Sequence, residues 1–198
     1  MRTAILLSGG LDSIALAHWK LPELALTVRY GQMAEEAEVR AASAVCNALG
    51  IQHEILKADI GSLGTGDLAG VPSVNVAPVS EWWPFRNQFL VTVAGMRAVG
   101  LGFELMMVGS VKTDGIHADG REEFYQRLSD LMTNQEGTLQ VSAPALHITS
   151  AELIKESGVP LSVLSWAHSC HTGDFACGKC RGCNKHFLVM QELGYAPY

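Results

Sequence analysis

Four of the five cysteines lie close together near the C-terminus, at a spacing that suits a metal site. They are Cys170, Cys177, Cys180 and Cys183, in the pattern Cys-x6-Cys-x2-Cys-x2-Cys. Four thiolates can surround one tetrahedral Zn²⁺, and because no coordination position then stays open, the predicted site is structural. The alternatives are a set in which His168 or His171 replaces one cysteine, an iron–sulfur cluster, or unconnected buried thiols. Cys46 is predicted to be a buried apolar residue.

A second chemical motif follows the first apolar run of the chain. It reads Ser8-Gly9-Gly10-Leu11-Asp12-Ser13. The glycines let backbone N–H groups approach an anion, and the N-terminus of the next helix adds a favourable dipole. Ser8 and Ser13 can donate hydroxyl hydrogen bonds to phosphate, and Asp12 can hold a phosphate-bridging Mg²⁺. The motif predicts a phosphate-binding loop, whereas the alternative is an ordinary strand-to-helix turn. It lacks the Gly-Lys-Ser/Thr ending of a Walker loop.

Alternating strand and helix patterns must position these residues. Such alternation predicts an α/β fold in which a parallel sheet has helices on both faces. Strands are expected over Thr3–Leu7, Leu24–Tyr30, Ile51–Lys57 and Glu104–Val108. Helices are expected over Leu11–Lys20, Met33–Leu49, Arg86–Leu101, Arg121–Thr133 and Thr149–Gly158, with a last one ending near Gly194. Thr149 or Ser150 is the expected N-cap of the fifth helix.

Two stretches without helical periodicity are candidates for binding loops. Residues 58–80 are rich in Gly, Pro, Ser and Val, and long loops in compact domains are often lids. Residues 111–120 are polar and contain two aspartates and a histidine.

Composition favours a globular protein that acts on a small molecule. The 198 residues are 48% hydrophobic and 17% charged, which argues against disorder and against a coiled coil. The formal net charge is −6 and no run of basic residues occurs, which argues against a nucleic-acid partner. The apolar runs are too short to cross a bilayer, and the N-terminus lacks the features of a signal peptide, so we expect a cytoplasmic protein without a membrane partner.

Taken together, the motifs resemble the 7-cyano-7-deazaguanine synthase (QueC) family, within the PP-loop ATP pyrophosphatases. The resemblance extends over nearly the whole chain. Its segments are Ser8–Ser13, Tyr30-Gly31-Gln32, Pro84-Phe85-Arg86-Asn87, Val108-Gly109 before Thr113-Asp114, Ser142–Leu146 with Ser150–Ile154, and Trp166 with Cys170. The resemblance implies a Rossmann-like PP-loop domain of the HUP type over residues 1–160 and a zinc-binding segment over residues 161–198.

The resemblance also implies a reaction and its residues. A carboxylate of 7-carboxy-7-deazaguanine is adenylated by ATP, and ammonia then displaces AMP to give an amide, which a second activation dehydrates to the nitrile. Asp12, Arg86 and Asp114 are the implied catalytic residues. The nucleotide contacts are Ser8, Gly9, Gly10, Leu11, Asp12, Ser13, Tyr30 and Gln32, and the substrate contacts are Arg86, Asn87, Asp114 and Asp119. The implied cofactors are ATP, Mg²⁺ and Zn²⁺, and the implied assembly is a homodimer or a complex with an acceptor protein.

The chain departs from the family pattern near the expected substrate. Arg29 stands where the family has Asp, and Ile116–Arg121 lacks a family Tyr and Cys. Adenylation is therefore the firmer expectation, and the acceptor is either ammonia or a protein amine, as in antiphage-defence relatives. A tRNA-modifying enzyme and a catalytically silent nucleotide-binding protein are the alternatives of other classes. Solvent-exposed roles for Arg86, Asp114 and Asp119, and simple packing of Trp82 and Trp83, also stay open.

Overall fold

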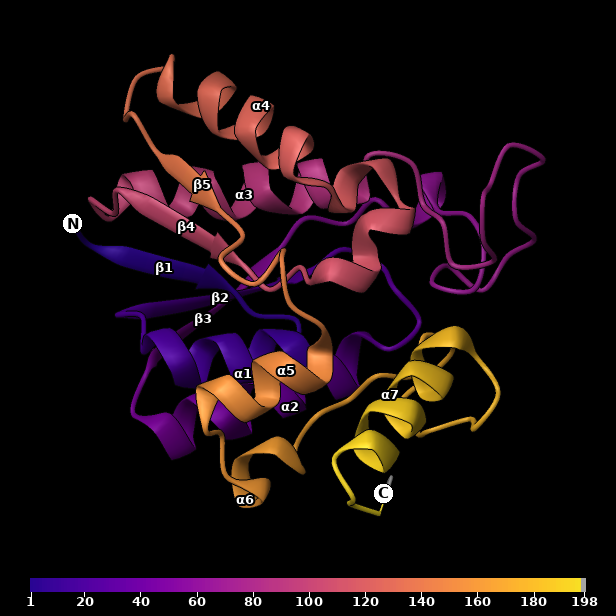
Figure 1. The fold of residues 1–198 in the computed structure, drawn as a ribbon. Coiled ribbons are helices and arrows are strands. Elements are labelled where there is room, and N and C mark those ends of the chain that lie inside the picture. The colour runs from indigo at the N-terminus through magenta and orange to yellow at the C-terminus, as the bar shows by residue number, and fades with distance from the viewer. Residues whose placement is uncertain (197–198) are drawn as a thin grey trace.

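Five strands form one parallel sheet in the order β3-β2-β1-β4-β5 in the computed structural model, which describes residues 1–196 (Figure 1). The strands are β1 (Thr3–Leu6), β2 (Leu24–Arg29), β3 (Gln52–Lys57), β4 (Leu105–Val108) and β5 (Gln140–Ser142). Every pair of neighbouring strands is parallel, and Leu6 at the end of β1 pairs with Val108 at the end of β4. The predicted α/β fold with a parallel sheet is confirmed. The last two residues of the predicted segment 161–198 lie outside the described range.

Helices cover both faces of the sheet, because the central strands are apolar on both sides. One face carries α1 (Leu11–Lys20), α2 (Glu35–Leu49), α5 (Ser150–Ser157), α6 (Leu161–Leu164) and α7 (Arg181–Glu192). The other carries α3 (Arg86–Gly100) and α4 (Glu122–Thr133). Side chains of alternate residues along a strand pack into the cores on opposite faces of the sheet. Ile5 and Met107 belong to the core under α1, while Ala4 and Met106 belong to the core under α3.

The predicted elements agree with the structure to within one or two residues at each end. Thr149 is the N-cap of α5, where its side chain accepts a hydrogen bond from the Glu152 backbone N–H, as a capping box requires. The sequence did not predict β5, which has a single buried residue, Val141, nor the four-residue helix α6. Residues 58–85 are irregular apart from a 3-10 turn at Gly61–Leu63. The polar stretch after β4 folds into two 3-10 helices, η2 (Lys112–Ile116) and η3 (Ala118–Gly120).

The order of the strands places the predicted phosphate loop at a switch point. Because β1 lies between β2 and β4, the order of the strands reverses at β1, and α/β sheets bind ligands outside the carboxyl ends of the strands at such a point. Gly109 allows the two segments to approach closely, since a Cβ atom there would lie 2.8 Å from the Cα atom of Ser13. The segments that follow β1 and β4 therefore lie side by side.

The C-terminal helix packs on the same core as the sheet. Val189 and Met190 of α7 belong to the cluster that contains Ile14 of α1 and Leu153 of α5. The proposed division at residue 160 stays a prediction. Within residues 1–196, no helix has the length and apolar character needed to cross a bilayer.

Candidate active site and metal centre

The loop after β1 is held in place by contacts with its own residues and with the segment before the cysteines. Gly9 adopts a positive φ of 78°, and a Cβ atom there would lie 2.7 Å from the carbonyl oxygen of Glu38. The Ser8 and Ser13 hydroxyl oxygens lie 3.2 Å apart, and Ser13 Oγ donates to the Gly10 carbonyl at 3.0 Å. The His168 N–H donates to the Gly9 carbonyl at 2.9 Å. The loop is thus rigid, with two hydroxyls beside the N-terminus of α1.

Leu11 and Asp12 begin α1 and point to different surroundings. Leu11 is buried in the core, so only its backbone is available to a ligand. The Asp12 side chain is 14% exposed, and its Oδ1 atom is buried without a hydrogen-bond partner among the described residues. A buried, unpaired carboxylate oxygen is costly unless a cation binds it. Mg²⁺ prefers oxygen ligands of this kind, so Asp12 fits the predicted metal contact.

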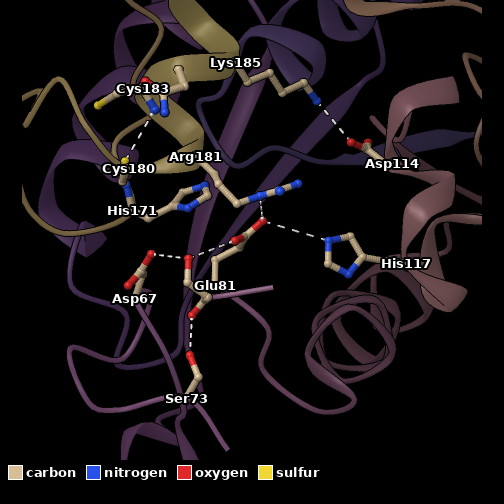
Figure 2. Close-up of polar contacts among 12 residues, drawn as sticks. Asp67, Ser73, Glu81, Asp114, His117, His171, Cys180, Arg181, Cys183 and Lys185 are labelled. Carbon is tan, nitrogen blue, oxygen red and sulfur yellow. Dashed lines mark hydrogen bonds and ion pairs between the residues drawn. The ribbon is translucent and has the colours of Figure 1, made fainter. Parts of the chain in front are cut away.

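A lysine that the sequence did not single out joins Asp12 to Asp114. Lys185 Nζ lies 2.8 Å from Asp12 Oδ2. It also lies 3.1 Å from Asp114 Oδ1 (Figure 2). Burial alone would lower the pKa of Lys185, but the two carboxylates outweigh burial and raise the pKa above its usual value. Asp114 Oδ2 also accepts from the Val111 N–H at 3.0 Å. A single lysine on a helix carries no sequence signal, so only the fold reveals this contact.

Arg86, Asn87 and Asp119 come together in one pocket. Its lining is Glu81, Trp82, Trp83, Arg86, Asn87, His117 and Asp119. Asn87 Oδ1 accepts from Arg86 Nη2 at 3.1 Å, which orients the guanidinium. The pocket combines indole rings, a guanidinium and two carboxylates, groups that can bind a flat polar ligand with N–H donors and an anionic group. Its volume of about 40 Å³ is close to that of a single water molecule, so the lining side chains must move apart to admit such a ligand. Asp114 is not among its lining residues, but η2 and η3 link it to Asp119 in a single short segment.

Tyr30 and Gln32 have buried side chains. Tyr30 is 5% exposed, and its ring packs edge-on against Trp83 with the ring centroids 5.3 Å apart. Gln32 is 4% exposed; its Oε1 accepts from the Tyr30 N–H at 2.9 Å and its Nε2 donates to Glu38 Oε2 at 2.7 Å. These residues support the floor of the site, and their direct contact with a nucleotide stays a prediction.

Glu81 connects three segments that are distant in sequence. Its side chain is 13% exposed and lies 2.7 Å from Arg181 Nε of α7 and 3.9 Å from His117 Nε2 (Figure 2). The neighbouring Ser80 hydroxyl donates to Asp67 at 2.7 Å. Because Glu81 belongs to the irregular segment 58–85, this contact fixes that segment against α7 and the 3-10 pair. Glu81 was not predicted from the sequence, because it belongs to no motif.

The four predicted cysteines come together in a cluster that could hold a metal ion. Their sulfur atoms all lie within 4.8 Å of one another, and Cys177 Sγ is 3.9 Å from Cys183 Sγ. A tetrahedron with Zn–S distances of about 2.3 Å needs sulfurs roughly 3.8 Å apart, so the cluster fits zinc. Cys177 Sγ accepts hydrogen bonds, of which the one from the Thr172 side chain has the largest effect. Together these bonds lower the pKa of the Cys177 thiol to about 5. His168 and His171 are not members of the group.

Comparisons with known proteins agree with this geometry. A family model described as "Queuosine biosynthesis protein QueC" matches residues 2–192. A relative from Methanosarcina mazei is 28% identical over 98% of this chain and 95% of its own length, and one from Acidobacterium capsulatum is 31% identical over 96% and 92%. Both are named 7-cyano-7-deazaguanine synthase, as is a relative from Chlorobaculum parvum at 28% identity over 99% of this chain and 94% of its own length. The match covers the phosphate loop, the pocket and the cysteine cluster, and the chain belongs to the QueC family.

Proposed function

We propose that this chain is an ATP-dependent carbon–nitrogen ligase that converts 7-carboxy-7-deazaguanine to 7-cyano-7-deazaguanine. The observation that carries the proposal is the contact between the loop after β1 and the segment after β4. Lys185 joins Asp12, whose Oδ1 atom has no hydrogen-bond partner among the described residues, to Asp114. The segment that holds Asp114 also carries Asp119, which lines the pocket of Arg86 and Asn87. The relatives' printed name supports the substrate class.

Adenylation is the first step. A carboxylate oxygen of the substrate attacks the α-phosphorus of ATP, the bond to the bridging oxygen breaks, and pyrophosphate leaves. Backbone N–H groups of the loop and the hydroxyls of Ser8 and Ser13 stabilise the charge on the phosphates. Arg86 faces the pocket, where its guanidinium can hold the substrate carboxylate near the α-phosphate. Mg²⁺ on Asp12 would supply further charge neutralisation.

Amide formation and dehydration of the amide follow. Ammonia adds to the acyl carbon, the bond to the AMP oxygen breaks, and loss of a proton leaves the primary amide. The amide oxygen then attacks a second ATP and expels pyrophosphate. AMP departs with that oxygen, two protons leave the nitrogen, and the nitrile results. The same adenylation site therefore serves both activations.

A protein amine is the second candidate acceptor. The observation that favours it is the position of the family departures, because His117 and Asp119 belong to the divergent stretch and line the pocket. The adenylation step is unchanged, and attack by the protein amine on the acyl carbon releases AMP and forms an amide link.

The products decide between these functions. Zinc-loaded protein is incubated with 7-carboxy-7-deazaguanine, Mg-ATP and ¹⁵N-ammonium. The products are identified by mass spectrometry, and the released AMP and pyrophosphate are quantified. We expect a ¹⁵N-labelled nitrile and equal amounts of AMP and pyrophosphate. Asp12→Asn is expected to slow the reaction by about 100-fold or more. An amide-linked conjugate formed only with a candidate partner protein would support the second acceptor. Absence of carboxylate-dependent AMP release would overturn adenylation.

A further inference from the structure

Lys185 lies on the first turns of α7, where the metal centre and the phosphate loop meet. Cys183, two residues earlier, contributes a buried sulfur to the cluster and donates its N–H to Cys180 Sγ at 3.4 Å. The Lys185 side chain reaches the segments that follow β1 and β4, where its ammonium contacts Asp12 and Asp114. It is 38% exposed, so a ligand can reach it.

The Lys185 ammonium retains capacity for another ligand. An ammonium has three N–H donors, and the two carboxylates use two of them at 2.8 Å and 3.1 Å. The third can bind an anion without loss of the contacts already made. The carboxylates in turn need a cation beside them, because two uncompensated negative charges at the end of the phosphate loop would repel a triphosphate.

Resting on the proposed function, we propose that Lys185 is a binding residue for the β- and γ-phosphates of ATP. Asp12 and Asp114 hold the flexible lysine stem in place, one carboxylate from α1 and one from η2, so that its charge lies beside the loop before the nucleotide binds. The Asp12 Oδ1 atom stays available for a cation, because Lys185 contacts only Oδ2. Lysine and cation thus bind the same carboxylate through different oxygens.

A purely structural ion pair that anchors α7 would give the same contacts without nucleotide. The two roles differ in what the loss of the charge does. A phosphate ligand affects ATP and pyrophosphate but not AMP, which lacks the β- and γ-phosphates. A structural anchor affects all three, because it changes the shape of the site as a whole.

Calorimetric titration with ATP, pyrophosphate and AMP separates these roles. Lys185→Met is compared with Lys179→Met, a change of an exposed lysine in the same cysteine segment, after the zinc content of each has been measured. For Lys185→Met we expect a loss of about 10- to 100-fold in affinity for ATP and pyrophosphate, with AMP affinity unchanged. Lys179→Met should match the wild type for all three ligands.

A conservative variant protects the test against simple misfolding. Lys185→Arg keeps the positive charge and is expected to bind ATP within several-fold of the wild type. If Lys185→Met loses affinity for ATP and AMP equally, or loses affinity for neither, the assignment of Lys185 as a phosphate-binding residue is overturned. Failure of the wild type itself to bind ATP would instead refute the proposed function.

Discussion

Glu38 is a half-buried carboxylic acid beside the phosphate loop. Its backbone carbonyl lies where a side chain on Gly9 would be, and its Oε2 accepts from Gln32 Nε2 at 2.7 Å. Burial raises the pKa of Glu38 to about 7, although the Gln32 hydrogen bond and the nearby Arg86 act in the opposite direction. A single residue therefore takes up a proton in the folded protein near neutral pH.

Replacement of Glu38 by Gln should stabilise the protein at high pH. The pKa is about 7 in the folded state against an ordinary 4.5, so the stability that protonated Glu38 provides is lost as pH rises through 7. Glutamine keeps an acceptor for Gln32 and does not titrate. We expect the stability gain of Glu38→Gln over the wild type to grow by roughly 2 kcal/mol between pH 5 and pH 8. Urea unfolding measures it, and exposed Glu36→Gln is the control. A pH-independent difference would contradict the burial of this acid.

At the scale of elements, the irregular segment 58–85 is held in place by a few backbone hydrogen bonds to its neighbours and by side-chain contacts. Glu81 provides one of the side-chain contacts, through Arg181 of α7, and His117 between η2 and η3 lies nearby. Trp83 adds a buried contact with Tyr30. The segment thus forms one wall of the pocket without forming a strand or an α-helix.

Glu81→Gln should loosen this wall without disturbing the phosphate loop. Removal of the charge weakens the contact with Arg181, so we expect backbone amides of residues 58–85 to exchange with deuterium roughly 3- to 10-fold faster. Amides of residues 8–13 should exchange as in the wild type. Glu123→Gln, which removes an exposed i,i+4 pair with Arg127, is the matched control. Unchanged exchange in 58–85 would show that Glu81 does not hold the segment.

The sequence predicted elements and local motifs much better than contacts between elements. The strands β1 to β4 and the longer helices were predictable, because apolar runs, periodicity and turn residues are local signals. The edge strand β5 was not, since Gln140, Val141 and Ser142 contain one apolar residue and form a strand only by pairing with β4. Lys185 and Glu81 were missed for a related reason, because their partners are distant in sequence. Lys185 contacts aspartates that lie 71 and 173 residues away, and Glu81 contacts an arginine 100 residues away.

At the scale of the whole molecule, the cysteine cluster and the sheet are physically continuous. The N-terminus of α7 lies in the cluster, while Val189 and Met190 near its end pack on the sheet core. His186 of the same helix lies 3.0 Å from Ser169 Oγ, which leads back toward the phosphate loop through the neighbouring His168. Loss of order at the cysteine cluster would therefore also disturb the residues around the phosphate loop.

Removal of the proposed zinc ion should abolish ATP binding while the sheet persists. Without metal the four thiolates lose their common ligand, so α7 and its side chains lose their fixed position. We expect a chelator to release one zinc per chain and eliminate calorimetric ATP binding, with most of the far-UV circular dichroism retained. Cys177→Ser should behave like chelated protein, whereas Cys46→Ser should keep its metal. Full ATP binding by metal-free protein would contradict this dependence.

The two-residue separation of Cys183 and Lys185 has a thermodynamic consequence. If the metal organises a residue that binds nucleotide, then occupancy of either ligand must raise the affinity for the other by the same factor, because linkage is reciprocal. Protein saturated with ATP would bind the metal with the higher affinity, and nucleotide-free protein would bind it with the lower affinity. The close spacing of Cys183 and Lys185 on α7 would thus couple the metal content of the protein to the ATP concentration.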